Sequence, residues 1–456
     1  MAAGRFVFAF ASALCYAHGS PHKEQSVNLV IRRLVPAIAI AGLLVSGGCC
    51  PVTGARPTVT PTAIVMPTAT STPLPTPTPA PTPSPTVVVP KEVPDAFRSL
   101  YAELRQQLDG LEAELPATLP AAGTIVAADL NVANSNRGPD LLAQGGYLGI
   151  LNYLSRLADL NARGVTISIN YPLLLPETPR YREYINLYRV VAQQLRGRKV
   201  KLHIRVGSTP TDPGLSRWLP DYEGLALESM IRGRRQHVDT ILREFSPDYL
   251  TIVDDPAVES QVTGVQLGVA EYTRLITSTL QGLDRRGVWI GACVSPATDP
   301  AYLESLLQDT SLDLIDLRLD SLAPGTSVRL AELASSVRRS GKRLIIGEAW
   351  LSKAVQGAGA LSPLQLAARD TFGFWQPLDA RFVTDLVRLA RFQQCEWVSF
   401  APSRYFFGYL DYVTTPKDLD DAQVLERAVT ESGQAAALSR LTETGMAFGV
   451  AATRSQ

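Results

Sequence analysis

Short apolar, β-branched runs alternate with amphipathic helical stretches along most of this chain, and this alternation limits the fold more than any other feature. Eight runs have the length of strands, and stretches with helical periodicity lie between them. Eight strand–helix units in about 330 residues predict a (β/α)8 barrel over residues 121–456. The predicted strands are 124–130, 164–171, 199–206, 249–255, 288–295, 312–320, 343–350 and 396–402.

An open, doubly wound parallel sheet is the main alternative for the same alternation. Such sheets often carry a Gly-rich phosphate-binding turn after the first strand. Here that turn reads ADLNVANSNRGPD, which lacks the fingerprint. We therefore favour the barrel, and we predict no cofactor.

The first 50 residues have the features of a targeting region. Arg32 and Arg33 precede the apolar run LVPAIAIAGLLVSGG and then Cys49. This run is shorter than the ~20 residues that a membrane span needs, so an export signal fits it better. The small residues before Cys49 resemble the lipobox of bacterial lipoproteins, although Val45 stands one place too far from the cysteine. Lipidation at Cys49, simple secretion and an uncleaved anchor are the open alternatives. An earlier apolar run, FVFAFASALCYA, indicates a start codon assigned too early.

Residues 51–93 are predicted to form a stalk. From Pro51 to Pro90 the chain is rich in proline and threonine, with one arginine and no acid. Such a sequence cannot bury enough apolar surface to fold, and it favours extended polyproline geometry. Residues 94–120 then predict a helix that packs on the barrel or links it to the stalk. A lipid anchor in the membrane, a stalk and a domain suit a protein that acts outside the cell.

Charge and cysteine content exclude several classes of partner. The 43 basic and 43 acidic residues balance, and no basic block supplies a nucleic-acid-binding face. Cys293 and Cys395 lie within apolar runs of the folded part, which favours buried free thiols over a disulfide framework. No His/Cys/Asp cluster has metal-ligand spacing, so we predict no metal site and expect a monomer.

The barrel prediction also indicates where a site would lie. Active sites of these barrels sit at the C-terminal ends of the strands, so the polar residues that close the apolar runs are the candidates. In chain order they are Asp129, Asn131, Asn170, Tyr171, His203, Arg205, Asp254, Asp255, Arg318, Asp320, Glu348, Trp350, Ser403, Arg404 and Tyr405.

Two of these acids, Asp255 and Glu348, close the fourth and seventh predicted strands. Retaining glycosidases use two carboxyl groups about 5–5.5 Å apart, one as nucleophile and one as acid/base. Strands four and seven lie on opposite sides of an eight-stranded barrel mouth, so side chains that lean inward from both can face one sugar ring. The pattern predicts a carbohydrate ligand.

Three segments resemble known glycoside hydrolases. LIIGEAW resembles the seventh strand of clan A enzymes, and this resemblance implies that Glu348 is the nucleophile. KLHIRVGSTPTDPGLSRW resembles family 53, the endo-β-1,4-galactanases, in its histidine-bearing strand and its Asp212-Pro213-Gly214 loop. AADLN is similar to the opening strand of that family. The resemblance of layout covers residues 124–415.

The chain also departs from the clan A pattern. Strand four of those enzymes ends in Asn-Glu-Pro, and here it ends in Asp254-Asp255-Pro256, so Asp255 holds the position of the acid/base. Aspartate is one methylene shorter, which loses about 1.5 Å of reach, and proton transfer needs about 2.6–3.2 Å. Strand two lacks the arginine common in the clan, and strand eight ends in Ala401 where a sugar-platform tryptophan is common.

Simpler structural roles compete with the catalytic ones. An acid pair before a proline often ends a strand or caps the next helix, which would account for Asp254 and Asp255. Glu259 is a fallback acid, although acids at helix starts are usually solvated. The aromatic run RYFFGYLDY and Trp375, with Trp350, either stack on sugar or pack the loops.

Strand three carries an unusual amount of charge for a barrel strand. Lys201, His203 and Arg205 alternate on one of its faces. They form either a salt-bridged interior layer or a group that orients substrate and tunes Glu348.

The sequence thus predicts an exported, lipid-anchored glycoside hydrolase-like barrel acting on a β-linked polysaccharide or oligosaccharide. A non-catalytic sugar-binding protein on the same scaffold is the alternative from another class. A barrel hydrolase of unrelated chemistry is the third hypothesis, since fold alone does not fix function.

Overall fold

The computed structural model describes residues 88–117, 123–209, 211, 214–322, 325–354 and 361–453. The predicted targeting region and most of the predicted stalk lie outside these residues, so both stay predictions. No helix in the described ranges is both long enough and apolar enough to cross a membrane.

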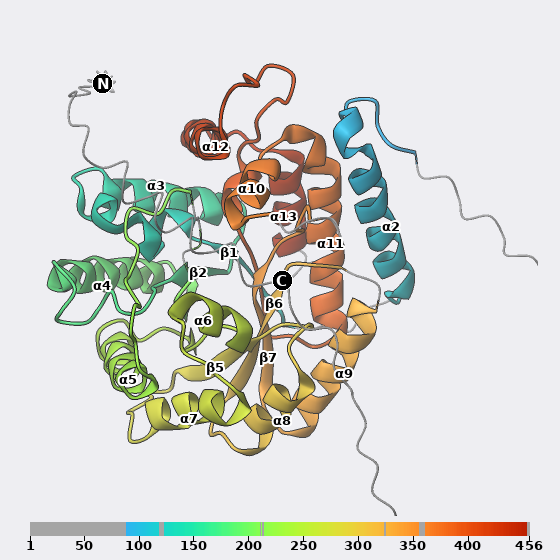
Figure 1. Ribbon diagram of the computed structural model, residues 1–456. Helices are drawn as coiled ribbons and strands as arrows, with labels where there is room; N and C mark the ends of the chain where they lie inside the picture. The colour runs from blue at the N-terminus through green and yellow to red at the C-terminus, as the bar shows by residue number, and fades with distance from the viewer. Residues whose placement is uncertain are drawn as a thin grey trace, which may run out of the picture. The chain divides into compact units, whose positions relative to one another are not determined.

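Eight parallel strands close into a barrel in the order of the chain, from β1 to β8 and back to β1 (Figure 1). The predicted (β/α)8 fold is therefore confirmed. Each strand is buried on both faces because helices cover its outer side, which explains the continuous apolar runs. The strands are β1 (Ile125–Asp129), β2 (Gly164–Ser168), β3 (Lys201–Arg205), β4 (Tyr249–Thr251), β5 (Trp289–Val294), β6 (Leu314–Leu319), β7 (Arg343–Ala349) and β8 (Trp397–Phe400).

The strands are shorter than predicted, most of all β4. It ends at Thr251 rather than at residue 255, so Asp254 and Asp255 lie in the loop that follows it and not on the strand. The predicted strand boundary is wrong here because apolar residues 252 and 253 continue the run after the ladder has ended. These two residues are buried, like those of the strand.

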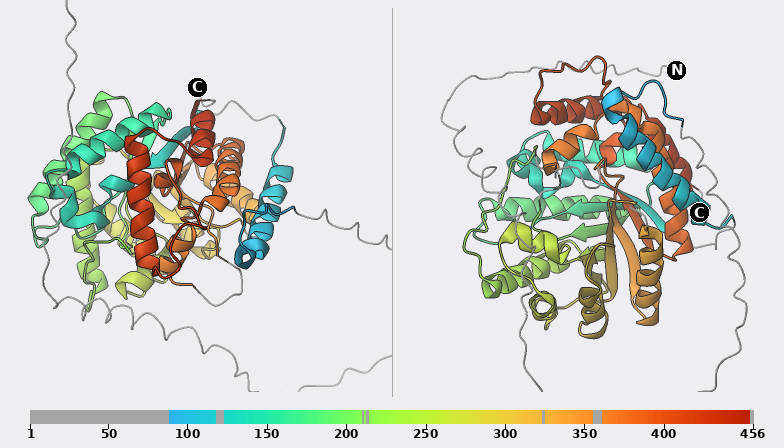
Figure 2. Two further views of the ribbon diagram at one scale, coloured as in Figure 1. Left: turned by 90° about the horizontal axis from the view of Figure 1, so that it is seen from above. Right: turned by 45° about the vertical axis from the view of Figure 1, so that its right-hand side comes forward.

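Helices follow the strands and form the outer layer. They are α2 (Arg98–Glu114), α3 (Gly146–Asp159), α4 (Tyr181–Gly197), α5 (Leu227–Glu244), α6 (Pro256–Thr263), α7 (Val269–Leu280), α8 (Pro300–Gln308), α9 (Thr326–Arg339), α10 (Pro363–Arg369), α11 (Gln376–Phe392), α12 (Asp421–Ala437) and α13 (Glu443–Thr453). Short 3-10 helices are η1 (Asp95–Phe97), η2 (Asn131–Ala133), η3 (Ser135–Leu142), η4 (Gly373–Trp375) and η5 (Ser403–Phe406). Figure 2 shows α2 along the outside of α11, where Arg381 of α11 pairs with Asp109 and Glu112 of α2.

The lower part of the barrel interior is apolar. Trp397 of β8 is completely buried and packs against Tyr249 of β4, with ring centroids 5.3 Å apart. β2 starts with Gly164, where a Cβ would overlap the Trp397 indole, so glycine is the residue that leaves room for this ring. Side chains of β1, β6 and β7 complete this cluster.

Above this layer the barrel interior becomes polar. His203 of β3 is fully buried and lies 2.9 Å from Thr251 Oγ1 through its Nε2. Because the Thr251 hydroxyl donates to Asp316 of β6 (2.8 Å), the hydrogen between His203 and Thr251 belongs to Nε2. Burial, with Arg205 nearby, lowers the pKa of His203 well below its ordinary value, so the ring is neutral.

Cys293 and Cys395 are both buried free thiols, as predicted. Burial raises the pKa of each thiol above its ordinary value. Within the described ranges, no group of three or more His, Cys, Asp or Glu side chains is arranged to hold a metal ion.

Candidate functional site

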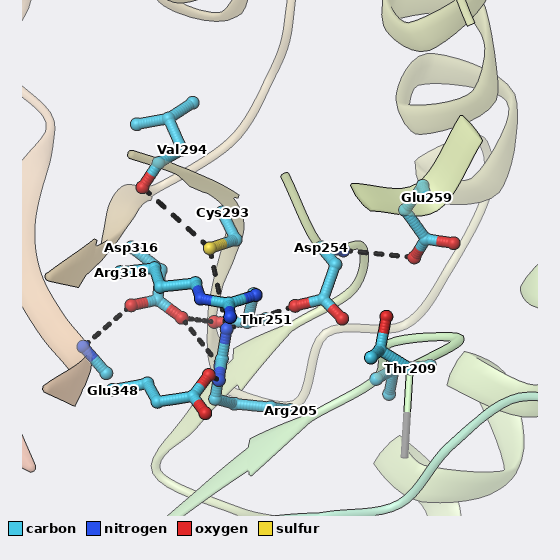
Figure 3. A network of polar contacts seen from close by, with 12 residues as sticks. Arg205, Thr209, Thr251, Asp254, Glu259, Cys293, Val294, Asp316, Arg318 and Glu348 are labelled. Atoms are coloured by element: carbon cyan, nitrogen blue, oxygen red, sulfur yellow. Dashed lines mark hydrogen bonds and ion pairs between the residues drawn. The ribbon is translucent and has the colours of Figure 1, made fainter. Parts of the chain in front are cut away.

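Arg205 is the centre of a cluster of charged side chains at the barrel mouth. It is the last residue of β3, and it shares the inward face with His203 because alternate residues of a strand face the same side. Four side chains, from β5, β6, β7 and the loop after β4, contact its guanidinium group (Figure 3).

Three of these partners are carboxylates. Arg205 Nη1 donates to Glu348 of β7, Nη2 lies 3.1 Å from Asp254 Oδ1, and Nε lies 3.3 Å from Asp316 Oδ2. Nη2 is also 3.5 Å from Cys293 Sγ. The Asp316 side chain is completely buried, whereas the side chains of Asp254 and Glu348 are 12% and 17% exposed. Only the latter two are therefore open to a ligand.

The charges of this cluster are not balanced. Burial opposes the charge of Arg205, but Asp316, Cys293 and Asp254 together raise its pKa above the ordinary value, so it stays a cation. Burial raises the pKa of Asp316, and Arg205, Thr251 and the Gly347 N–H oppose that shift. One guanidinium group thus serves several carboxylates in a site of low dielectric.

A β-bulge turns Glu348 into the barrel. Ile346 pairs with Leu317 of β6 and Glu348 pairs with Arg318, so Gly347 is an extra residue in β7. Strict alternation from the inward Ile345 would place Gly347 inside and Glu348 outside. The bulge changes this alternation, and the Glu348 carboxylate meets Arg205 inside the mouth.

Asp254 is held in the loop after β4. Its backbone N–H donates to Glu259 Oε1 (3.0 Å), and its carbonyl accepts from the Tyr272 hydroxyl (2.8 Å). Gly207 allows the Asp254 carboxylate to approach β3, because a Cβ on Gly207 would lie 2.7 Å from Asp254 Cγ. The backbone of Asp254 is therefore fixed, and its carboxylate faces Arg205.

Glu259 is a structural residue rather than a solvated one. It is completely buried in an ion pair with Arg234 of α5, 3.1 Å between Arg234 Nη1 and Glu259 Oε1. The expectation of a solvated acid at a helix start is wrong here, because the Glu259 carboxylate pairs with Arg234 and accepts from the Asp254 N–H in the protein interior.

Asp255 caps α6. Its Oδ1 accepts from the Ala257 N–H (3.0 Å), and its Oδ2 accepts from the Thr298 hydroxyl in the loop after β5. It lines a pocket of about 440 Å³ with Thr298 and Tyr302, and neither Arg205 nor Glu348 belongs to that lining. Of the two roles that the sequence left open for Asp255, this geometry supports the helix cap.

The loops after β1, β2 and β3 form a polar wall of amide and hydroxyl groups. Asn134 Nδ2 donates to Asp129 Oδ1 (3.0 Å), and Ser135 donates to Asn170 Oδ1 (2.6 Å). Asn170 Nδ2 in turn donates to the Thr209 carbonyl (2.6 Å). In Figure 3 the Thr209 hydroxyl points toward the Asp254 carboxylate.

The other predicted site residues lie outside the group of side chains that contact Arg205. Arg318 lies over the Trp350 ring at 4.8 Å and pairs with Asp320, beside Glu348. Arg404 and Tyr405 of η5 are buried, and Tyr405 stacks on Tyr409.

Asn131 and Tyr171 are both buried as well. Tyr171 packs against α5, where Gly233 makes room for its ring and Arg234 lies 5.0 Å from the ring centroid.

Trp375 is not available to stack on a sugar. Its side chain is completely buried, and its ring stacks on Tyr101 of α2. Its indole N–H donates to the Arg369 carbonyl (3.0 Å). The aromatic-stacking alternative is therefore wrong for Trp375, which packs α2 onto the barrel.

The sequence reasoning missed Asp316 and Gly347. Asp316 alternates with Leu314 and Arg318 in LDLIDLRLD, and an acid in the middle of an apolar run was the available signal. Gly347 gave no signal, because a bulge depends on the register between strands.

No protein-family model and no curated protein sequence matches this chain. Solved structures that resemble it include a GH113 β-1,4-mannanase solved as a complex (10% identity, TM-score 0.40, 69% of this chain and 98% of that one). Xylanase 10C from Cellvibrio japonicus is 12% identical with a TM-score of 0.40, and the match covers 82% of this chain and 76% of that one. The family 1 β-glucosidase from Thermotoga maritima is 11% identical with a TM-score of 0.39, and the match covers 68% of this chain and 97% of that one. This likeness concerns the fold alone, and the family 53 resemblance stays a prediction.

Proposed function

We propose that this protein is an exported glycoside hydrolase-like enzyme that acts on a β-linked polysaccharide or oligosaccharide. The supporting observation is that Asp254 and Glu348, from opposite sides of the barrel mouth, both contact the guanidinium group of Arg205. On the sequence evidence given above, this proposal also includes export, lipidation at Cys49, a membrane anchor and a monomeric state.

The shared guanidinium group limits the distance between the two carboxylates. Two hydrogen bonds plus the width of one guanidinium group place their nearest oxygens roughly 8 Å apart at most. Retaining glycosidases need about 5–5.5 Å between the carboxyl groups and inverting ones about 6.5–9.5 Å. The arrangement is compatible with a two-carboxylate mechanism, and the resemblance of β7 to clan A favours retention.

In this mechanism Glu348 attacks the anomeric carbon and forms a glycosyl–enzyme bond, while Asp254 gives a proton to the departing glycosidic oxygen. Asp254 then takes a proton from the water that cleaves this bond. We assign the acid/base role to Asp254 because both carboxylate oxygens of Asp255 are engaged at the start of α6. Asp255 remains the competing assignment, because it holds the position of the acid/base in the motif that resembles strand four of clan A enzymes.

A second candidate function is sugar binding without catalysis. Arg205 bridges the two carboxylates directly, and Asp255, which holds the acid/base position of the clan, caps a helix. Both features fit a site that has lost hydrolysis and kept a polar mouth.

The two candidates are separated by turnover measurements on the full chain. A panel of β-linked polysaccharides and aryl β-glycosides is incubated with the wild type and with Glu348→Gln, Asp254→Asn and Asp255→Asn. We expect turnover by the wild type, a loss of at least about 100-fold in the first two variants, and near-wild-type activity in Asp255→Asn, because asparagine also caps helices.

Each alternative outcome has a distinct meaning. Loss of activity in Asp255→Asn with retention in Asp254→Asn would transfer the acid/base role to Asp255. Oligosaccharide binding with no turnover by any of the four proteins would establish the binding function instead.

A further inference from the structure

The Glu348 carboxylate reaches the barrel mouth only because the strand that carries it is distorted. On the β8 side, Ile346 pairs with Val398 and Ala349 pairs with Phe400, so Gly347 and Glu348 together oppose one residue of β8. Such a two-against-one arrangement leaves the extra residue out of the ladder and re-aims the side chain that follows it. An N–H group released in this way and buried needs another acceptor.

Asp316 supplies that acceptor. The Gly347 N–H donates to Asp316 Oδ1 at 2.7 Å, across the β6–β7 pair. A Cβ on Gly347 would lie 2.7 Å from Asp316 Cγ, so a glycine is needed for the carboxylate to sit beneath the bulge. The Asp316 carboxylate and the Gly347 backbone therefore form one contact that fixes the bulge next to Glu348.

The other oxygen of Asp316 serves Arg205. Oδ2 accepts from the Thr251 hydroxyl at 2.8 Å and lies 3.3 Å from Arg205 Nε. The contact between Arg205 Nε and Oδ2 is an ion pair rather than a hydrogen bond, and the two terminal nitrogens of the guanidinium group face Glu348 and Asp254. Asp316 thus connects β3, β4, β6 and β7 at the level directly beneath the proposed catalytic pair.

Packing alone does not explain an acid at this position. The Asp316 side chain is completely buried, and apolar residues of similar volume often replace buried ion pairs without loss of stability. Placement of neighbouring groups does explain it, because Oδ1 accepts from the Gly347 N–H while Oδ2 accepts from the Thr251 hydroxyl and pairs with Arg205.

We propose that Asp316 is the positioning residue of this site, fixing through Oδ1 the bulge that turns Glu348 inward and through Oδ2 the guanidinium group that receives Glu348. This inference rests on the proposed function. Asp316 is too deeply buried to touch a substrate, so it acts through Glu348 and Arg205.

The test compares kcat and KM for Asp316→Asn, Gly347→Ala and the double variant on the substrate that the wild type turns over best. Asparagine retains one acceptor oxygen and carries no charge, so it can accept from the Gly347 N–H or from the Thr251 hydroxyl but not both, and it loses the ion pair with Arg205. We expect kcat to fall by about 100-fold, because a misplacement of 1 Å can cost this much, with KM within threefold of the wild type.

Two further readouts distinguish positioning from general destabilisation. The losses in kcat should be less than additive in the double variant, because both substitutions disturb the contact between Asp316 Oδ1 and the Gly347 N–H. The acid limb of the kcat/KM pH profile of Asp316→Asn should move to lower pH, because Arg205 then acts on Glu348 without the opposing charge of Asp316.

Asp379→Asn is the matched control. Asp379 is a buried carboxylate of α11 in an ion pair with Lys353, and burial raises its pKa as it does that of Asp316. Equal kcat in Asp316→Asn and Asp379→Asn, or additive losses in the double variant, would overturn the inference while the wild-type activity stands. Absence of wild-type turnover would overturn the proposed function, and the inference with it.

Discussion

Replacing Arg205 by leucine removes a cation that contacts three carboxylates at once. Asp316 would keep its hydrogen bonds from Thr251 and the Gly347 N–H, but its charge would stay in a completely buried site without compensation. Asp254 and Glu348 would lose the guanidinium group that now separates them. All three would then repel one another.

The size of the effect follows from the burial of these groups. Removing one partner of a buried ion pair costs about 3–5 kcal/mol, because it leaves an uncompensated charge. A half-exposed pair costs far less, about 0.3–0.5 kcal/mol for helix positions four residues apart. Arg427 and Glu431 of α12 form such a pair, with both side chains 41% exposed, so Arg427→Leu is the matched control.

The assay is urea unfolding of the wild type and both variants, followed by circular dichroism between pH 4 and pH 8. We expect Arg205→Leu to lose about 3–5 kcal/mol of unfolding free energy at pH 8. The deficit should shrink toward pH 4, because protonation of the unpaired carboxylates removes the uncompensated charge. A loss below about 1 kcal/mol, or a loss independent of pH, would refute the view of Arg205 as the counter-charge of this cluster.

Three further predictions concern stability. Burial, partly offset by Lys353, raises the pKa of Asp370 to about 7, so its charge destabilises the fold fully above pH 7 and progressively less as the pH falls. In urea unfolding, Asp370→Asn should therefore be more stable than the wild type, and this advantage should be roughly 2–3 kcal/mol larger at pH 8 than at pH 5. An equal advantage at both pH values would contradict this prediction. Gly164→Ala should lower the free energy of unfolding by about 1–3 kcal/mol or more, because the new methyl group overlaps the Trp397 ring; Gly145→Ala, with open space around its Cα, is the control and should be nearly neutral. Asp255→Ala should lose about 1 kcal/mol from the missing cap on α6 while Asp255→Asn loses almost none, and equal thermal midpoints for the two would argue against the cap.

The fold was accessible from the sequence because its signals are local. Each strand of a parallel barrel is buried on both faces, so it reads as a short apolar run whatever its neighbours are. Helix signals are local as well, as in the capping box that starts α12 at Asp420 and Gln423. Strand ends were less accessible, since β4 stops at Thr251 although the apolar run continues to Val253.

The candidate site was accessible only in part. Glu348 and Arg205 were found because charged residues inside apolar runs stand out, and both lie at the barrel mouth. The choice between Asp254 and Asp255 was not accessible, because adjacent residues leave a loop in different directions. The buried state of Trp375 depends on α2, which is distant in the chain.

The sequence by itself determined the eight strand–helix units and the set of polar residues at the strand ends, since hydrophobic periodicity is a property of neighbouring residues. Only the tertiary structure decided which of those residues meet. The register between β6, β7 and β8 creates the bulge at Gly347, and that bulge turns Glu348 from the outer face of β7 to Arg205 inside the barrel. Register is set by pairing between strands far apart in the chain, so no local pattern contains it.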